Sequence, residues 1–151
     1  MKHLFLTISI LWVMQTTAQQ TNYHFSATDS TTAASNKIWQ LWTDVPNWKQ
    51  WDKGLKDAVI DGAFKVGATG KIIPDKGPTS KFIVTELVPD TAYAFKTKIP
   101  FGWLVIKRTL TVKDDRTFFT HDVAFTGMLK NSLVKSLVKI TGPCCLKYCV
   151  K

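Results

Sequence analysis

Two ionisable side chains interrupt apolar stripes in the second half of the sequence. Arg108 falls within the alternating apolar stretch 104–112, and His121 falls within the alternating stretch 119–125. If both stripes face inward on adjacent strands, the two side chains would meet a ligand carboxylate or enolate. Arginine would supply a fixed positive charge, and histidine would supply acid–base chemistry near neutral pH. These two residues are therefore the candidates for catalysis.

The alternative is that both side chains have structural roles. A histidine on an apolar stripe can be satisfied by partners within the fold, and buried charges are usually paired. Glu86, in the stretch 82–88, is one acid that would pair with Arg108, and a salt bridge at a cavity rim is another role for it. The sequence leaves these interpretations open.

Other catalytic or metal-binding motifs are not visible. The sequence has no nucleophile motif, no phosphate-binding glycine loop and no pair of matched carboxylates, and 67–70 is interpreted as a turn and a strand start. The three cysteines, Cys144, Cys145 and Cys149, lack a second ligand pair for zinc. In an oxidising compartment two of them would pair, and the third would remain for an intermolecular bridge. We therefore expect no metal and no cofactor.

The elements that would position the candidate residues follow from hydrophobic periodicity. Residues 23–28 alternate and indicate a strand. Residues 33–43 and 46–51 place apolar side chains at helical spacing, and Pro46 separates these two short helices. Short alternating runs divided by turn residues then predict an antiparallel meander of about six strands. Those runs are 55–60, 68–73, 81–88, 92–99, 103–112 and 117–125.

Helical periodicity returns near the end of the sequence. Residues 128–141 form an amphipathic pattern whose apolar stripe includes Leu133 and Leu137, and Gly142-Pro143 ends it. The predicted order is therefore one strand, two short helices, six strands and one longer helix.

This order resembles the START-like, helix-grip group of proteins, the SRPBCC superfamily, and within it the polyketide cyclase/dehydrase-like branch. The residues that match are Ile38-Trp39 with Asp44, Trp48 to Asp52, Phe64 to Gly70, and Thr85 to Pro89. The resemblance covers roughly 21–140. It implies an α+β fold in which a curved antiparallel sheet of about seven strands wraps around the C-terminal helix, with the two short helices in a V at one end.

The resemblance also implies an apolar cavity between the sheet and the C-terminal helix. We therefore expect a binding protein for a small hydrophobic molecule, either a lipid or a polyketide-like compound. The alternative is a cyclase- or dehydratase-type enzyme that acts on a carbonyl substrate with His121 and Arg108, although fold is weak evidence of chemistry. Trp39 and Trp42 are interpreted as core. The residues expected at the ligand are Trp48, Trp51, Tyr93, Phe95, Trp103, Arg108, His121, Leu133 and Leu137.

The N-terminal segment has the layout of a secretory signal peptide. A basic start over 1–3 precedes an apolar run over 4–14, and small residues follow up to Ala18. We expect cleavage near Ala18 and a protein exported to the periplasm or the outside. The domain would then span 21–141, with a cysteine-containing tail over 142–151. A retained anchor and an N-terminal strand are the alternatives.

The net charge of +9 raises the question of an acidic partner. Only Arg108 and Arg116 are arginines, and the lysines are scattered, whereas nucleic-acid recognition relies on arginine. We therefore expect no nucleic-acid partner. Weak association of the basic helix 128–140 with an anionic membrane surface or a partner protein is a third hypothesis. The sequence does not indicate an oligomeric state.

Overall fold

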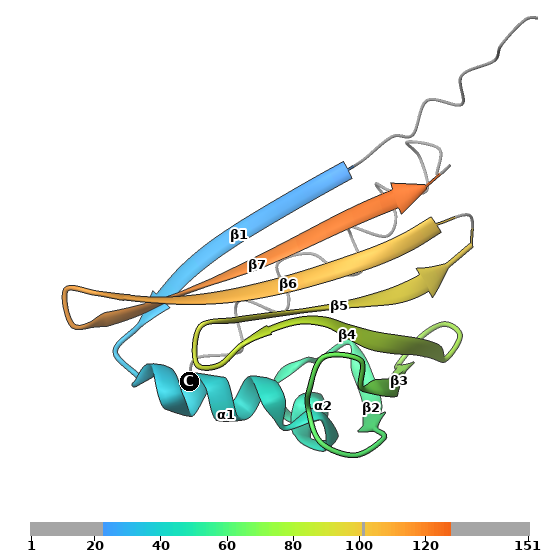
Figure 1. The fold of residues 1–151 in the computed structure, drawn as a ribbon, viewed down its shortest axis with the longest axis horizontal. Helices are drawn as coiled ribbons and strands as arrows, with labels where there is room; N and C mark the ends of the chain where they lie inside the picture. Colours follow the sequence, from blue (N-terminus) through green and yellow to red (C-terminus); the bar gives the residue numbers. More distant parts are fainter. Residues whose placement is uncertain (1–22, 101, 128–151) are drawn as a thin grey trace, which may run out of the picture.

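The computed structural model describes residues 23–100 and 102–127, which form one antiparallel sheet and a short helical segment (Figure 1). The sheet has seven strands in the order β1-β7-β6-β5-β4-β3-β2. The elements are β1 (Tyr23–Thr31), α1 (Ser35–Thr43), η1 (Val45–Asn47), α2 (Trp48–Trp51), β2 (Leu55–Ile60), β3 (Thr69–Pro74), β4 (Ser80–Val88), β5 (Ala92–Ile99), β6 (Gly102–Lys113) and β7 (Arg116–Gly127).

The strand pattern predicted from the sequence is confirmed. Each of the seven strands lies within a few residues of its predicted bounds, because alternating runs end where the chain needs a turn. The turn between β6 and β7 is an example. Asp114 and Asp115 adopt positive φ angles of 50° and 55° there, a conformation that suits a tight hairpin turn.

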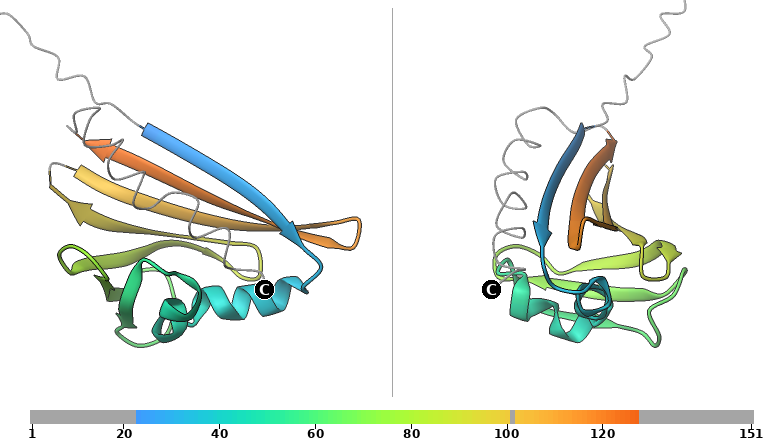
Figure 2. Two further views of the ribbon diagram at one scale, coloured as in Figure 1. Left: turned by 180° about the vertical axis from the view of Figure 1, so that it is seen from behind. Right: turned by 90° about the vertical axis from the view of Figure 1, so that its left-hand side faces the viewer.

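The helical segment also follows the predicted pattern. α1 ends at Thr43, and the chain then makes the 3₁₀ turn η1, which contains Pro46, before the single turn of α2. The break lies at Asp44, whose φ of −85° and ψ of 76° leave helical geometry, and Pro46 is tolerated in the first turn of η1 because its missing N–H has no helical partner there. Figure 2 shows the helices grouped next to β2–β4, while β1, β7 and β6 extend away from them.

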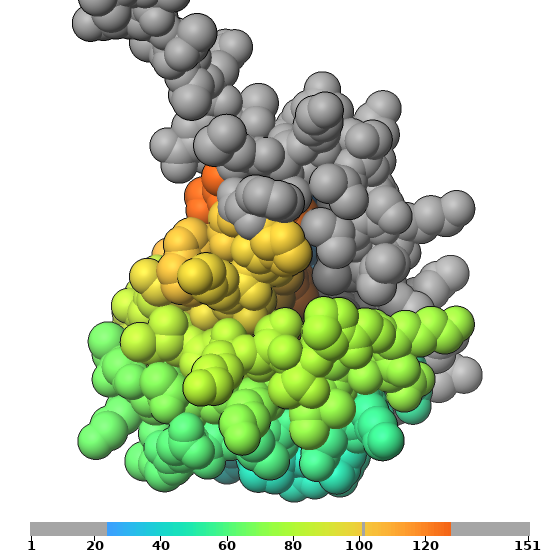
Figure 3. Space-filling view, turned by 90° about the vertical axis from the view of Figure 1, so that its right-hand side faces the viewer, coloured from blue at the N-terminus to red at the C-terminus, as the bar shows by residue number. Residues whose placement is uncertain are grey.

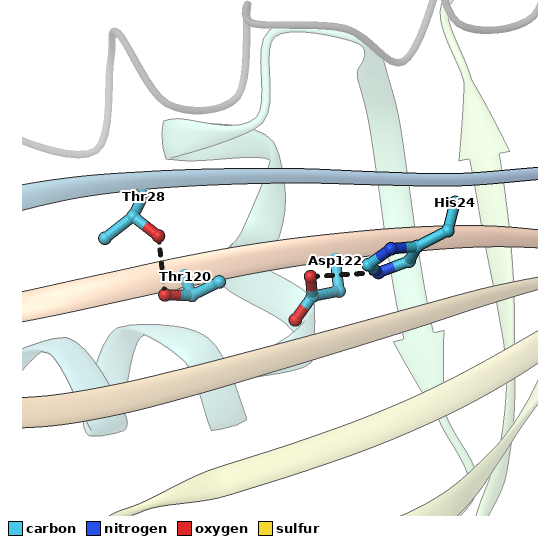
Figure 4. Close-up of polar contacts among 4 residues, drawn as sticks. All are labelled: His24, Thr28, Thr120 and Asp122. Carbon is cyan, nitrogen blue, oxygen red and sulfur yellow. Dashed lines mark hydrogen bonds and ion pairs between the residues drawn. The ribbon is translucent and has the colours of Figure 1, made fainter.

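The two faces of the sheet differ in character. We define the inner face as the one that packs on α1 and α2, where both Trp39 and Trp42 make edge-to-face contacts with Tyr93 of β5. The outer face is the opposite one and is largely polar. Figure 4 shows its β1–β7 portion, where Thr28 meets Thr120 with 2.9 Å between the hydroxyl oxygens. In the same figure His24 meets Asp122, with 3.1 Å between Nε2 and Oδ1.

The end of β4 lies on different faces from those that simple alternation predicts. A register shift between Val84 and Glu86 in β4 moves Glu86 to the outer face, where both carboxylate oxygens accept hydrogen bonds of 2.9 Å from Nζ of Lys107. The bulge brings Leu87 opposite Tyr93 instead. Of the two roles considered for Glu86, pairing with Arg108 is excluded because the two side chains lie on opposite faces, and Glu86 instead forms a salt bridge with Lys107.

Three predictions fall on segments outside the described residues. These are the signal peptide over 1–18, the C-terminal helix over 128–141 with Leu133 and Leu137, and the tail over 142–151. Within the described ranges, none of the helices has both the length and the apolar character needed to cross a membrane.

Candidate ligand-binding site

The candidate site lies at one level of the inner face, where the side chains of three neighbouring strands lie side by side. The strand register places Tyr93 of β5 directly opposite Arg108 of β6, and Arg108 directly opposite His121 of β7. Facing Cβ atoms in an antiparallel pair are roughly 5 Å apart, so the side chains are neighbours. The sheet thus brings together the two residues that the sequence singled out, with a tyrosine beside them.

Arg108 is the central residue of this row. Its side chain is 3% exposed, although arginine stays protonated in proteins. Three rings surround the guanidinium group, with centroids 4.6 Å (Trp51), 5.5 Å (Trp48) and 5.7 Å (Tyr93) from Cζ. We refer to these three rings as the aromatic cage. A desolvated cation over an aromatic face gains about 2 kcal/mol, which offsets part of the cost of burial.

Tyr93 orients the cation as well as contacting it. Nη1 of Arg108 donates a hydrogen bond to the phenol oxygen of Tyr93, whose side chain is fully buried. The Tyr93 ring is itself fixed by edge-to-face contacts with Trp39, Trp42 and Phe64. The position of the guanidinium group is therefore set by the packed core and not by a flexible loop.

His121 lacks the pKa that the catalytic alternative requires. Burial, and to a smaller extent the positive charge of Arg108, lower the pKa of His121 from 6.5 to about 3. Both effects disfavour the imidazolium form. His121 is therefore neutral at physiological pH, where it can donate and accept hydrogen bonds but exchanges protons poorly.

The four clustered tryptophans brace this site. Trp48 is 1% exposed, stacks on Phe82 and packs at a tilt on Phe95. Its Nε1 donates a hydrogen bond of 2.9 Å to the carbonyl oxygen of Trp42. Trp42, as expected, is buried, and Trp39 is partly buried against the same cluster. Trp48 is a core residue, and its position beside Arg108 makes it part of the site as well.

Trp51 contributes a second polar group near Arg108. Its ring is 4.6 Å from Cζ of Arg108, and the side chain is 6% exposed. Its Nε1 is buried and has no hydrogen-bond acceptor among the described residues. A buried donor of this kind is costly to leave unsatisfied, so it is available to a ligand oxygen.

The remaining predicted contacts divide between the two faces. Phe95 is 1% exposed on the inner face, one pleat from Tyr93. Trp103 lies on the outer face instead, 40% exposed, because it is opposite Lys98 in the β5–β6 register. It therefore points away from Arg108, and the other two residues, Leu133 and Leu137, lie outside the described residues.

The sequence named each residue of the aromatic cage but not their association around one cation. Trp48 and Trp51 belong to α2, while Tyr93 and Arg108 belong to β5 and β6. No local pattern reports which inner-face residue a distant helix covers. Within residues 23–100 and 102–127, no group of three or more histidine, cysteine or acidic side chains is placed to hold a metal ion.

Comparisons with solved structures agree with this architecture. The aromatase/cyclase Zhui from Streptomyces sp. R1128 has a TM-score of 0.69 at 12% identity, covering 85% of this chain and 92% of that one. The protein Ara h 8.0201 has a TM-score of 0.67 at 13% identity, with 85% and 95% covered. Norcoclaurine synthase from Thalictrum flavum has a TM-score of 0.64 at 12% identity, with 95% and 91% covered. No family profile matches the sequence, and no curated protein matches it.

These likenesses identify the class of fold. The chain shares the fold of these three proteins, in agreement with the helix-grip architecture that the resemblance implied. The seven-stranded antiparallel sheet and the two short helices are its described parts.

Proposed function

We propose that the protein is an exported carrier for a small hydrophobic molecule that bears one acidic group, a carboxylate or an enolate. The observation that supports this most directly is the buried guanidinium of Arg108 on the apolar inner face. In this picture the apolar body of the ligand rests on the inner-face side chains. Its acidic group accepts hydrogen bonds from Arg108, and Nε1 of Trp51 is a further donor.

The surroundings of Arg108 favour an acidic ligand over a neutral one. A guanidinium group in a low-dielectric setting attracts a negative charge more strongly than it would in water. Charge-assisted hydrogen bonds are about twice as strong as neutral ones. The aromatic cage and the hydrogen bond to the Tyr93 hydroxyl hold the guanidinium group in place, so little conformational entropy is lost when a ligand binds.

The chemistry of His121 favours a carrier over an enzyme. Proton transfer is most efficient when the pKa of the catalytic group is near the working pH, and the pKa of His121 is about 3. Norcoclaurine synthase and the aromatase/cyclase are enzymes by name, but a shared fold at this identity does not transfer their chemistry. A neutral His121 is better suited to a hydrogen bond with the bound acid.

Export is the part of the proposal that rests on sequence alone. It is supported by the basic, apolar and small-residue segments that end at Ala18. Expression of the full chain in a bacterial host, followed by intact mass measurement of the secreted or periplasmic form, tests it. Loss of residues 1–18 is expected, and a cytoplasmic full-length product would contradict export.

Native mass spectrometry of the purified protein tests the carrier role. We expect a mass increment from a co-purified hydrophobic acid, which organic extraction removes. Fatty acids should then quench tryptophan fluorescence in the extracted protein, because Trp48 and Trp51 border the site. A protein that shows neither an increment nor quenching would not be a carrier.

A further inference from the structure

The outer face carries a groove that the proposed carrier function does not use. Its volume is about 490 Å³. It lies where β3, β4, β5 and the start of β6 adjoin, at the end of the molecule that faces the viewer in Figure 3. Its lining residues are Asp61, Thr69, Gly70, Lys71, Lys81, Phe82, Ile83, Lys96, Lys98 and Trp103.

The strand register concentrates positive charge in this groove. Lys71 of β3 lies directly opposite Lys81 of β4, and Lys98 of β5 lies directly opposite Trp103 of β6. The pairing of Phe82 with Thr97 places Lys81 and Lys98 at the same level of neighbouring strands. Like charges that face each other across a sheet destabilise it, so this row is unfavourable in the absence of an anion.

Within the part of the chain that the structure describes, none of the four lysines in the groove lining forms an ion pair with an acid. The acid in the groove lining is Asp61, and its carboxylate accepts a hydrogen bond of 2.9 Å from the Thr69 hydroxyl. Among the described residues, the ion pairs join other cations to acids: His24 to Asp122, Lys49 to Asp57 and Lys107 to Glu86. The outer face therefore pairs one lysine of β6 and leaves the four lysines of the groove to act together.

Trp103 gives the groove a flat apolar wall. The side chain is 40% exposed, and Nζ of Lys96 lies 4.9 Å from its ring centroid. The Lys96 ammonium group therefore lies beside Trp103 within the groove lining. A large exposed ring beside several cations is typical of a surface that binds a ligand with both a charged and a hydrophobic or planar part.

From this arrangement we propose that the outer groove is a second binding site, for a compact anionic group of the phosphate class. Four lysine ammonium groups from three strands surround the anion, and Trp103 packs against the part of the ligand next to it. The phosphates belong either to the headgroup of an anionic lipid or to a soluble phosphorylated molecule. The site is on the opposite side of the sheet from Arg108, so it does not depend on the carrier function.

Two probes separate these sources. Pyrophosphate, followed by isothermal titration calorimetry, represents the soluble anion. Phosphatidylcholine vesicles with and without phosphatidylglycerol, followed by cosedimentation at low and high salt, represent the lipid headgroup. Binding of pyrophosphate supports a soluble ligand, and binding of the anionic vesicles alone supports a headgroup. If neither probe binds the wild-type chain at low salt, the site does not exist.

A matched pair of double variants tests the location. Lys71→Gln/Lys98→Gln removes two charges from the groove, and Lys37→Gln/Lys113→Gln removes two exposed charges from elsewhere. The first of these, the groove variant, should bind the active probe, meaning whichever of the two probes binds wild type, at least about tenfold more weakly. The reason is that each lysine near an anionic surface contributes appreciably to affinity. The control should bind within about twofold of wild type. Equal weakening by both variants would show a general effect of net charge and overturn the proposal.

Thermal unfolding tests the same site without a measurement of affinity. The groove variant should unfold at a higher temperature than wild type without a ligand, because the repulsion between facing lysines is relieved. The active probe should raise the unfolding temperature of wild type and not that of the groove variant. A lower unfolding temperature for the ligand-free groove variant would contradict the repulsion on which the site depends.

Discussion

Arg108 and His121 lie directly opposite each other on β6 and β7, and burial, together with the neighbouring cation, lowers the pKa of the histidine and keeps it neutral. The relationship assigns different tasks to the two residues that the sequence suggested as a catalytic pair. Arg108 is the fixed charge of the inner face, and His121 is a neutral hydrogen-bonding neighbour. A site with these properties binds an acid more readily than it moves a proton.

The first prediction concerns stability against pH. In the unfolded chain His121 takes up a proton near its ordinary pKa of 6.5, whereas in the folded protein it does so only near 3. Its contribution is therefore fully present above pH 6.5 and is lost as the pH falls from 6.5 towards 3, because protons then favour the unfolded chain. We expect a loss of up to about 3 kcal/mol at pH 4 from this residue.

Urea unfolding of wild type and His121→Gln between pH 4 and pH 8 measures this loss. The variant lacks the titrating group, so its free energy of unfolding should fall less steeply between pH 6.5 and pH 4. Both proteins keep the same carboxylates, which makes the difference between the two curves specific to the histidine. Parallel curves would show that the pKa of His121 is not lowered.

The second prediction concerns the tryptophan cluster. Trp48→Ala should lower the free energy of unfolding by about 3–5 kcal/mol, because the buried ring leaves a cavity against Phe82 and Phe95. Trp103→Ala is the control, since this ring is 40% exposed on the outer face. It should cost less than about 1 kcal/mol. Chemical denaturation measures both losses. Similar losses for the two variants would contradict the assignment of Trp48 to the core and of Trp103 to the surface.

The third prediction concerns a close approach inside the sheet. A Cβ atom on Gly70 would lie 2.3 Å from the carbonyl oxygen of Val59 and 2.5 Å from the Phe82 ring. Gly70→Ala should therefore destabilise the protein by about 3 kcal/mol, the upper range for overpacking, because backbone cannot move aside cheaply. A Cβ atom on Gly54 meets only a side-chain oxygen at 3.4 Å, so Gly54→Ala should be nearly neutral. Thermal unfolding of both variants beside wild type measures the difference, and equal unfolding temperatures for the two variants would contradict the close approach at Gly70.

The sequence was a good guide to the sheet and a poor one to side-chain partners. Alternation and turn residues report which strands exist, since both are local properties of the chain. The association of Trp51 with Arg108 depends on how a helical turn docks on a strand more distant in the sequence. Local patterns contain no information about that docking.

The case of Glu86 shows the same limit within one strand. Alternation from Phe82 and Val84 predicts an inward carboxylate, but the bulge after Val84 reverses the face. A bulge adds one residue without a clear composition signal, so every face assigned beyond it is shifted. Arg108 keeps the face of its apolar stripe because β6 pairs with β5 and β7 without interruption.

The central claim is that Arg108 binds the acidic group of a hydrophobic ligand. Decanoic acid and decanol form a matched pair of probes, since they share an alkyl chain and differ in charge. Quenching of tryptophan fluorescence at pH 7.5 measures the affinity of both for the extracted wild-type protein and for Arg108→Gln. Circular dichroism of the variant serves as the control for folding.

Wild type should bind the acid at least about tenfold more tightly than the alcohol, as expected for a hydrogen bond to a charged group. Arg108→Gln should lose most of that preference and retain its affinity for the alcohol. The wild-type comparison alone remains decisive if the variant does not fold. Equal affinity of wild type for decanoic acid and decanol, or no binding of either, would contradict the account.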